Sequence, residues 1–131
     1  MKKMWLLVCW GIARFAFAGD MPRTLFIENN LARTLSTVNL ETGAVHNDVA
    51  TLGQIPNQIL AYRDKVLALN SVPPEIMIID ASSLQVEKRV ALPEGSNPYG
   101  MALVGANRVY VTLLLMDAVA VVEIREGRVA K

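Results

Sequence analysis

Residues 95–112 read GSNPYGMALVGANRVYVT, and this stretch combines turn residues with two short apolar runs. Proline fixes its own φ and glycine permits a tight turn, so Gly95, Pro98 and Gly100 suit a narrow entry into a strand. The second run, Val109-Tyr110-Val111-Thr112, is rich in β-branched and aromatic residues that favour strands. The stretch therefore predicts two short antiparallel strands joined by a turn.

The same pattern recurs along the chain. Similar apolar runs begin at Leu25, Val66 and Val109, which are 41 and 43 residues apart. The Gly-x-x-Pro element at 95–98 is preceded by another at 53–56, a spacing of 42 residues. Several landmarks in one register indicate a repeat protein. Its units lie near residues 24–55, 56–98 and 99–131.

Within each unit the apolar pattern has the period of strands, and no long stretch shows the 3.6-residue period of an amphipathic helix. The predicted strands cover residues 24–28, 35–40, 44–51, 58–62, 65–69, 75–81, 85–92, 99–104, 108–113, 118–124 and 128–131. Four short antiparallel strands in a unit of about 42 residues are typical of a β-propeller blade. The expected fold class is all-β, with about two and a half blades of an incomplete propeller.

The stretch at 95–112 closely resembles the YVTN repeat, in which Gly-x-Asn-Pro-x-Gly-hydrophobic-Ala is followed by Arg-Val-Tyr-Val-Thr-Asn. The segment Ile78-Ile79-Asp80 is similar to the Val-Ile-Asp strand of that repeat. The resemblance covers about residues 24–131 and implies a seven-bladed propeller of the bacterial and archaeal YVTN type. This sequence departs from the repeat at Leu113, where Asn is usual, and at Pro56-Asn57, where Asn-Pro is usual.

In the order of strands that the resemblance implies, the strand containing Pro98 is innermost, and the first unit begins at the second strand of a blade. Four to eight blades of about 42 residues need roughly 170 to 340 residues. We therefore expect either an N-terminal fragment of a longer propeller or separate chains that complete a ring. The expected partners are the missing blades or further copies, because open blade faces and strand edges favour aggregation, self-association or partial unfolding.

The first eighteen residues, 1–18, have the features of a secretory signal peptide. A positive pair, Lys2 and Lys3, precedes an apolar run from Met4 to Ala13, and Ala16-Phe17-Ala18 has the small-x-small form of a cleavage site. Cleavage after Ala18 predicts a periplasmic or extracellular protein. An uncleaved membrane anchor and a buried N-terminal strand are the alternatives.

The segment 19–131 contains no cysteine and no tryptophan, and it has 10 basic and 12 acidic residues. This composition excludes a disulfide framework, a thiolate nucleophile and Cys-ligated zinc, and it gives no bulk electrostatic case for nucleic acid. The only histidine, His46, is expected in a solvated hairpin turn. We find no carboxylate spacing typical of a catalytic dyad and no phosphate loop, so we expect no cofactor and no metal.

Two classes of function remain open. The resemblance implies a noncatalytic binding or scaffolding propeller, whose small-molecule or protein ligand meets the loops at one end of the central channel. It also allows part of a propeller enzyme or cofactor carrier, lactonase-like or haem d1-binding-like, but the segment lacks the clustered ligands that such chemistry needs. The residues favour binding. The candidate ligand-binding residues, expected in loops on one rim, are Asn29, Asn30, Arg33, Asn57, Asn70, Glu75, Asn97 and Asp117.

Other residues of the same regions have expected structural roles. Asn29 and Asn70 follow predicted strands, where an Asn side chain can bond its own backbone and close a turn. Tyr99 and Tyr110 alternate with core positions, which indicates packing. The run Leu113–Met116 is apolar where the earlier units are polar or contain proline, so it is either buried against a following blade or part of a partner surface.

Overall fold

The computed structural model describes residues 23–130, and this part of the chain is all-β. The strands are β1 (Thr24–Asn29), β2 (Thr34–Asn39), β3 (Val45–Thr51), β4 (Pro56–Tyr62), β5 (Lys65–Ser71), β6 (Pro74–Asp80), β7 (Val86–Ala91), β8 (Pro98–Val104), β9 (Arg108–Leu113), β10 (Ala118–Glu123) and β11 (Arg128–Val129). One short 3₁₀ turn, η1 (Leu114–Met116), follows β9. Each of the eleven predicted strands overlaps one of these strands, whereas the predicted signal peptide and residue 131 of the last predicted strand lie outside the described residues.

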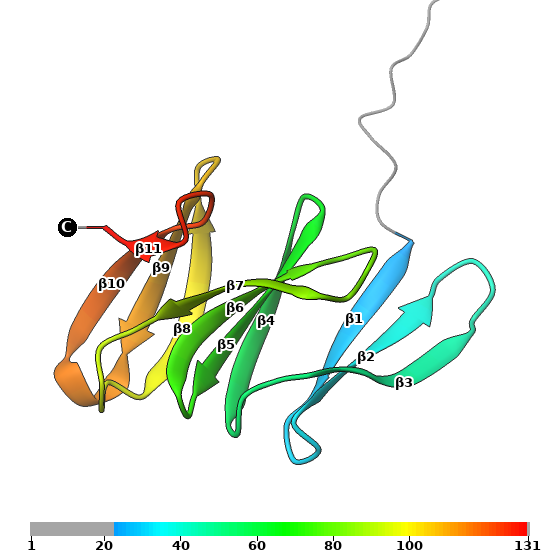
Figure 1. Cartoon of the computed structure of the whole chain (residues 1–131), viewed down its shortest axis with the longest axis horizontal. Helices are drawn as coiled ribbons and strands as arrows, with labels where there is room; N and C mark the ends of the chain where they lie inside the picture. The colour runs from blue at the N-terminus through cyan, green and yellow to red at the C-terminus, as the bar shows by residue number, and fades with distance from the viewer. Residues whose placement is uncertain (1–22, 131) are drawn as a thin grey trace, which may run out of the picture.

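The strands form three antiparallel meanders that lie side by side (Figure 1). The first sheet has the order β1-β2-β3, the second β4-β5-β6-β7 and the third β8-β9-β10-β11. Within each sheet, every strand pairs with the next strand along the chain, so each sheet is built from local hairpins, as a propeller blade is. Among residues 23–130 there is no helix long and apolar enough to span a membrane.

The strands β4 and β8 enter their sheets in the same way. In β4 the pairing shifts between Pro56 and Gln58, and in β8 it shifts between Pro98 and Gly100. A shift of this kind places an extra residue in one strand and turns its side chain in a new direction. Asn57 and Tyr99, the residues at these two shifts, therefore occupy corresponding positions.

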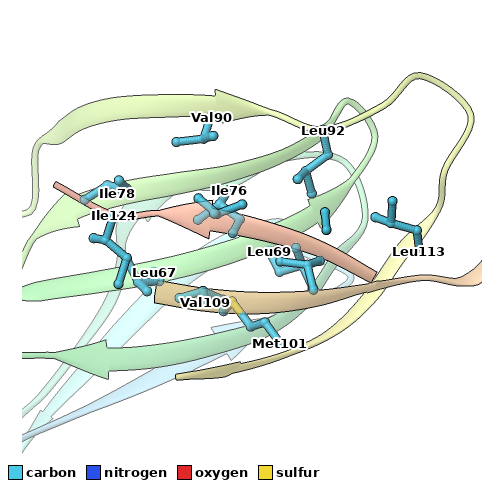
Figure 2. Packing of buried hydrophobic residues seen from close by; sticks show 13 residues of the cluster. Leu67, Leu69, Ile76, Ile78, Val90, Leu92, Met101, Val109, Leu113 and Ile124 are labelled. Carbon is cyan, nitrogen blue, oxygen red and sulfur yellow. The ribbon is translucent and has the colours of Figure 1, made fainter. Parts of the chain in front are cut away.

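The core lies between the sheets in two layers. Side chains of a strand point alternately to its two faces, so the second sheet contributes to both layers. Toward the first sheet it presents Val66, Ala68, Met77 and Ile79. Toward the third sheet it presents Leu67, Leu69, Ile76 and Ile78, which pack with Val109, Val111, Ala120 and Val122 (Figure 2).

The structure corrects two expectations from the sequence, one on His46 and one on the tyrosines Tyr99 and Tyr110. His46 is exposed, as expected, but it lies within β3 and not in the hairpin turn. The expected packing of Tyr99 and Tyr110 is wrong within the described chain, because both belong to the third sheet and remain exposed. Their exposure follows from the position of that sheet, which has a neighbour on one face only.

Candidate ligand-binding rim

The eight candidate residues lie at one end of the three sheets, at the lower edge of Figure 1. This end, which we call the candidate rim, is formed by the turns β1–β2, β5–β6 and β9–β10 and by the chain entering β4 and β8. Strand pairing brings the ends together, since Asn29 pairs with Thr34 and Asn70 with Glu75. The expectation that all eight lie in loops is wrong for four of them, which belong to strand ends: Asn29, Asn57, Asn70 and Glu75.

Side chains at the candidate rim connect each sheet to the next. Asn30 Nδ2 donates to the carbonyl oxygen of Pro56 at 2.5 Å, which joins the first sheet to β4. Ser71, at the corresponding position one unit later, lies 3.0 Å from the carbonyl oxygen of Pro98 through its hydroxyl. The same type of contact, from a side chain at or directly after the end of a strand to the proline carbonyl of the next sheet, therefore occurs twice.

Three polar side chains form a small network between the second and third sheets. Asn57 Nδ2 donates to Ser71 Oγ at 2.6 Å and to the carbonyl oxygen of Pro98 at 2.6 Å. Ser71 Oγ can in turn donate to Asn97 Oδ1 at 2.7 Å. Asn97 has a φ of +46°, a left-handed conformation that Asn tolerates better than most residues. The network uses the polar groups of two candidate residues to hold the sheets together.

Asn70 and Glu75 are buried, and their contacts are structural. Asn70 Oδ1 accepts a hydrogen bond from the backbone N–H of Gly53 at 3.0 Å, while Asn70 Nδ2 has no partner among residues 23–130. Glu75 Oε1 pairs with Arg89 at 2.5 Å. Neither residue lines the groove described below.

Asn29 differs from its expected role. Its Nδ2 donates to Thr34 Oγ1 at 3.1 Å and to Ser36 Oγ at 2.6 Å. The expectation that Asn29 and Asn70 bond their own backbone is wrong, because both are the partners of side chains or backbone groups on another segment. Both residues lie in paired strands, where the neighbouring strand already supplies hydrogen-bond partners for the backbone N–H and C=O groups. The side-chain amides of Asn29 and Asn70 are therefore free to make these longer-range contacts.

Arg33 and Asp117 precede β2 and β10, respectively, and share an unusual backbone conformation. Their φ values are +61° and +46°, in the left-handed region, and both residues are exposed. The Arg33 N–H donates to the carbonyl oxygen of Asn29 at 2.7 Å, which closes the β1–β2 turn. Both residues are available to solvent at the candidate rim, but neither lines the groove described next.

A groove of about 680 Å³ opens at the candidate rim between the second and third sheets. The loop before β4 supplies Gln54 and Ile55, the β5–β6 turn supplies Val72, the loop before β8 supplies Glu94, and η1 supplies Leu115. Ser71 and Asn97, from the polar network, lie at its inner wall. Its volume falls in the range typical of small-ligand sites, and its walls combine apolar side chains with few polar groups.

Sequence reasoning found Asn97 but missed the other groove residues, including Ile55, Val72 and Leu115. Ile55 and Val72 are ordinary apolar residues of turn segments, and only folding brings them together. The sequence does contain a signal for Leu115, because the run Leu113–Met116 is apolar at positions where the earlier units are polar or contain proline. In the structure Leu113 is buried, while Leu114, Leu115 and Met116 are exposed.

The opposite end of the sheets carries a different cluster. Lys65 Nζ lies 2.9 Å from Asp80 Oδ2 and 2.8 Å from Glu87 Oε1, and Asp64 is a third partner at 3.1 Å. The hydrogen bonds with Glu87, Asp80 and Asp64 raise the pKa of Lys65 above its usual value. The pKa of Asp80 is lowered, first by the backbone N–H of Ser83 and then by Lys65.

A groove of about 270 Å³ beside this cluster is lined by Arg63, Lys65, Glu87, Lys88 and Arg125. It is smaller than the groove at the candidate rim. The charge of Lys65 is matched by carboxylates, whereas Arg63, Lys88 and Arg125 leave the lining with more cationic than acidic side chains. We favour the larger groove as the candidate site because its volume falls within the range typical of small-ligand sites.

Within residues 23–130, no three His, Cys, Asp or Glu residues are grouped so that they could hold a metal ion. No family model matches this sequence, and a search of curated proteins finds no match.

Proposed function

We propose that this chain is an exported, noncatalytic β-propeller binding or scaffolding module of the YVTN-like type. The proposal is supported by the motif at residues 95–112 and by the stacking of one three-stranded and two four-stranded antiparallel meanders around two apolar layers. The observation that carries the binding function is the groove at the candidate rim, where loops from successive sheets meet.

The groove favours a small ligand with an apolar body and a cationic or hydrogen-bond-donating group. Ile55, Val72 and Leu115 supply exposed apolar surface. Glu94 is exposed at the groove and is the one carboxylate among the lining residues that the structure describes. Gln54 and Asn97 add amide groups that can orient a ligand without catalysing a reaction.

The binding function is tested by titrating the isotope-labelled protein with phenethylamine and with 3-phenylpropanoate, two probes of similar shape and opposite charge. We expect the amine to perturb the backbone amide signals of Gln54, Val72 and Leu115 more strongly than the carboxylate does, because Glu94 attracts the cation. Glu94→Gln should remove this preference, whereas the control Glu126→Gln, at the opposite end, should leave it unchanged. Equal responses to both probes, or shifts confined to the opposite end, would contradict the proposal.

Export has an independent test. Mass spectrometry of the protein recovered from its native cell envelope should find Gly19 as the first residue, because Ala16-Phe17-Ala18 is the proposed cleavage motif. Ala18→Leu should slow cleavage, since the position before the cut requires a small side chain. An intact Met1 on a soluble cytoplasmic form would show that the export proposal is wrong.

A further inference from the structure

Two apolar sheet faces have no neighbouring sheet among residues 23–130. The first-sheet face is the side of β1–β3 that points away from the second sheet and includes Leu25 and Ile27. The third-sheet face is the side of β8–β11 that points away from the second sheet and includes Tyr110 and Val119. Corresponding residues in the other sheets show what each face would contact.

The first-sheet face carries apolar residues at positions that are covered elsewhere. Leu25 is 48% exposed, whereas Val66 and Val109, at the corresponding positions of the second and third sheets, are 0% exposed. Ile27 is also exposed, while Ala68 at its corresponding position is fully buried. In the second and third sheets this side contacts the preceding sheet.

The third-sheet face shows the same difference on the opposite side. Val119 is 57% exposed, whereas Ile76, at the corresponding position of the second sheet, is 1% exposed. Tyr110 is exposed, while the corresponding Leu67 is fully buried. A shallow groove of about 420 Å³ lies on this face beside Tyr110 and Val119. In the first and second sheets this side contacts the following sheet.

The chain thus displays both halves of an interface that it already forms twice. At the first-to-second and second-to-third junctions, the face of one sheet that points toward the next sheet along the chain packs on the face of that next sheet that points back. The third-sheet face is the side that would point toward a next sheet. The first-sheet face is the side that would point back toward a preceding sheet. Packing of one on the other would extend the established stacking and cover both apolar surfaces.

Polar residues on the third-sheet face do not argue against such packing. Thr112 of this face corresponds to Glu28 of β1, which points toward the second sheet at a junction that is already formed. Burial raises the pKa of Glu28, with a hydrogen bond to Asn30 opposing the shift, so a partly polar face is compatible with contact. Tyr99 corresponds to Asn57, whose side chain contacts the next sheet through the carbonyl oxygen of Pro98. The Tyr99 side chain is exposed on the third sheet.

The rim contacts are also matched between the two faces. The proline carbonyl groups that accept from Asn30 and Ser71 lie on the entering strands β4 and β8, but the first sheet has no such strand in the described residues. At the position of Asn30 and Ser71, the third sheet has Leu114, which carries no donor side chain. Within residues 23–130, the junction that these two faces would form therefore has neither the donor side chain nor the proline carbonyl acceptor of the other two junctions.

We propose that two copies of this chain associate head to tail, with the third-sheet face of each copy packed on the first-sheet face of the other. Two such junctions are related by a two-fold axis and bring six sheets together, which lies within the four to eight blades of closed propellers. This inference concerns assembly and does not depend on the ligand of the groove at the candidate rim.

Sedimentation of the purified full chain at micromolar concentration tests this assembly. The wild-type protein should sediment at twice the chain mass. Leu25→Glu and Val119→Glu should each weaken association by at least about a hundredfold, because each places a charge in both junctions of the dimer. The matched control Leu31→Glu, at a 97% exposed leucine in the β1–β2 turn, should leave the dimer intact. Far-UV circular dichroism checks the fold, and Ile27→Glu replaces Leu25→Glu if that variant does not fold.

Mixing the Leu25→Glu and Val119→Glu chains gives the decisive result. One junction in the mixed pair joins two unchanged faces and the other joins two altered faces, so the mixture should regain a dimer that neither variant forms alone. A contact between identical faces would not be restored in this way. The proposal would be overturned by a monomeric wild-type chain, by open-ended oligomers or by a mixture that stays monomeric. A monomeric wild-type chain is also the result expected if blades of another chain cover these faces.

Discussion

Within residues 23–130, the second sheet has a neighbouring sheet on both faces and the third sheet has one on a single face, and the same strand positions differ accordingly. In the second sheet, β5 and β6 are buried along nearly their whole length. In the third sheet, β9 alternates strictly between exposed and buried residues. The sequences follow this difference, because Val66-Leu67-Ala68-Leu69 is continuously apolar whereas Val109-Tyr110-Val111-Thr112 alternates. The central residues of β5 and β6, which are covered on both faces within the chain, are apolar at every position, whereas β9 has Tyr110 and Thr112 on the face that only a second copy would cover.

The largest expected effect compares Ile76 and Val119, which occupy corresponding positions in the two sheets. Ile76→Ala should lower the free energy of unfolding by about 2–5 kcal/mol, because it leaves a cavity in the layer between the second and third sheets. Val119→Ala should lower it by no more than about 0.5 kcal/mol in the dissociated chain, because the side chain is exposed. Urea denaturation at low protein concentration measures both values.

Equal losses at the two positions would show that the third-sheet face is as well covered as the second sheet. A loss at Val119 that grows with protein concentration would instead place this residue in the contact between copies. The pair of substitutions thus separates packing within one chain from packing between chains.

A smaller effect is expected at two glycines that begin corresponding turns. A Cβ at Gly53 would lie 2.5 Å from Asn70 Cγ, so Gly53→Ala should cost about 1–3 kcal/mol through crowding of a buried side chain. Gly95 has a φ of +71° and open space around the added atom, so Gly95→Ala should cost about 1–2 kcal/mol through backbone strain alone.

A double-mutant cycle distinguishes these causes. Asn70→Ala should relieve part of the effect of Gly53→Ala, so the two substitutions should be non-additive. The same change should combine additively with Gly95→Ala, to within about 0.5 kcal/mol. Additivity in both cycles would contradict the contact between Gly53 and Asn70.

These comparisons also explain what the sequence could predict. The eleven strands were found because apolar runs and turn residues act locally, and the hairpin order follows from the chain. The shared rim was found because consecutive antiparallel strands must place alternate turns at one end. The contacts of Asn57 and Ser71 across the sheets were not found, because they depend on a local shift in pairing that redirects the Asn57 side chain.

Burial of polar residues was equally hidden in the sequence. Glu75 is one of the candidate ligand-binding residues, and the sequence did not show that it is buried and paired with Arg89 from the adjacent strand. The exposure of Tyr110 could not be read from its alternation with core residues, because alternation does not tell whether the other face has a neighbour. The burial of Glu75 and the exposure of Tyr110 both depend on packing between segments that are distant in the sequence.

The smallest expected effect concerns the turn after β6, compared with the turn after β2. Asp80 Oδ1 accepts hydrogen bonds from the backbone N–H groups of Ser82 and Ser83 at 3.1 and 2.8 Å. At the corresponding position in the first sheet, Asn39 Oδ1 accepts from the two equivalent N–H groups, those of Glu41 and Thr42, at 2.8 and 3.0 Å. An uncharged amide therefore suffices for the turn, and only Asp80 adds an ion pair with Lys65.

Asp80→Asn should consequently preserve the turn and lose only the charge-dependent part of its stability. The pKa of Asp80 is lowered from its usual value of 3.8, so the stabilisation from its charge is fully present above that value and is lost as the pH falls through the lowered pKa. Thermal unfolding of the wild type and the variant should show a lower Tm for the variant at pH 7, and the difference should shrink as the pH is lowered below 4.

Asn39→Asp is the matched control, because the first sheet has Thr24 where the second has Lys65, and it should gain no comparable stability at pH 7. A difference between wild type and Asp80→Asn that stays constant down to pH 2 would show that the turn, and not the charge, is what the substitution disturbs.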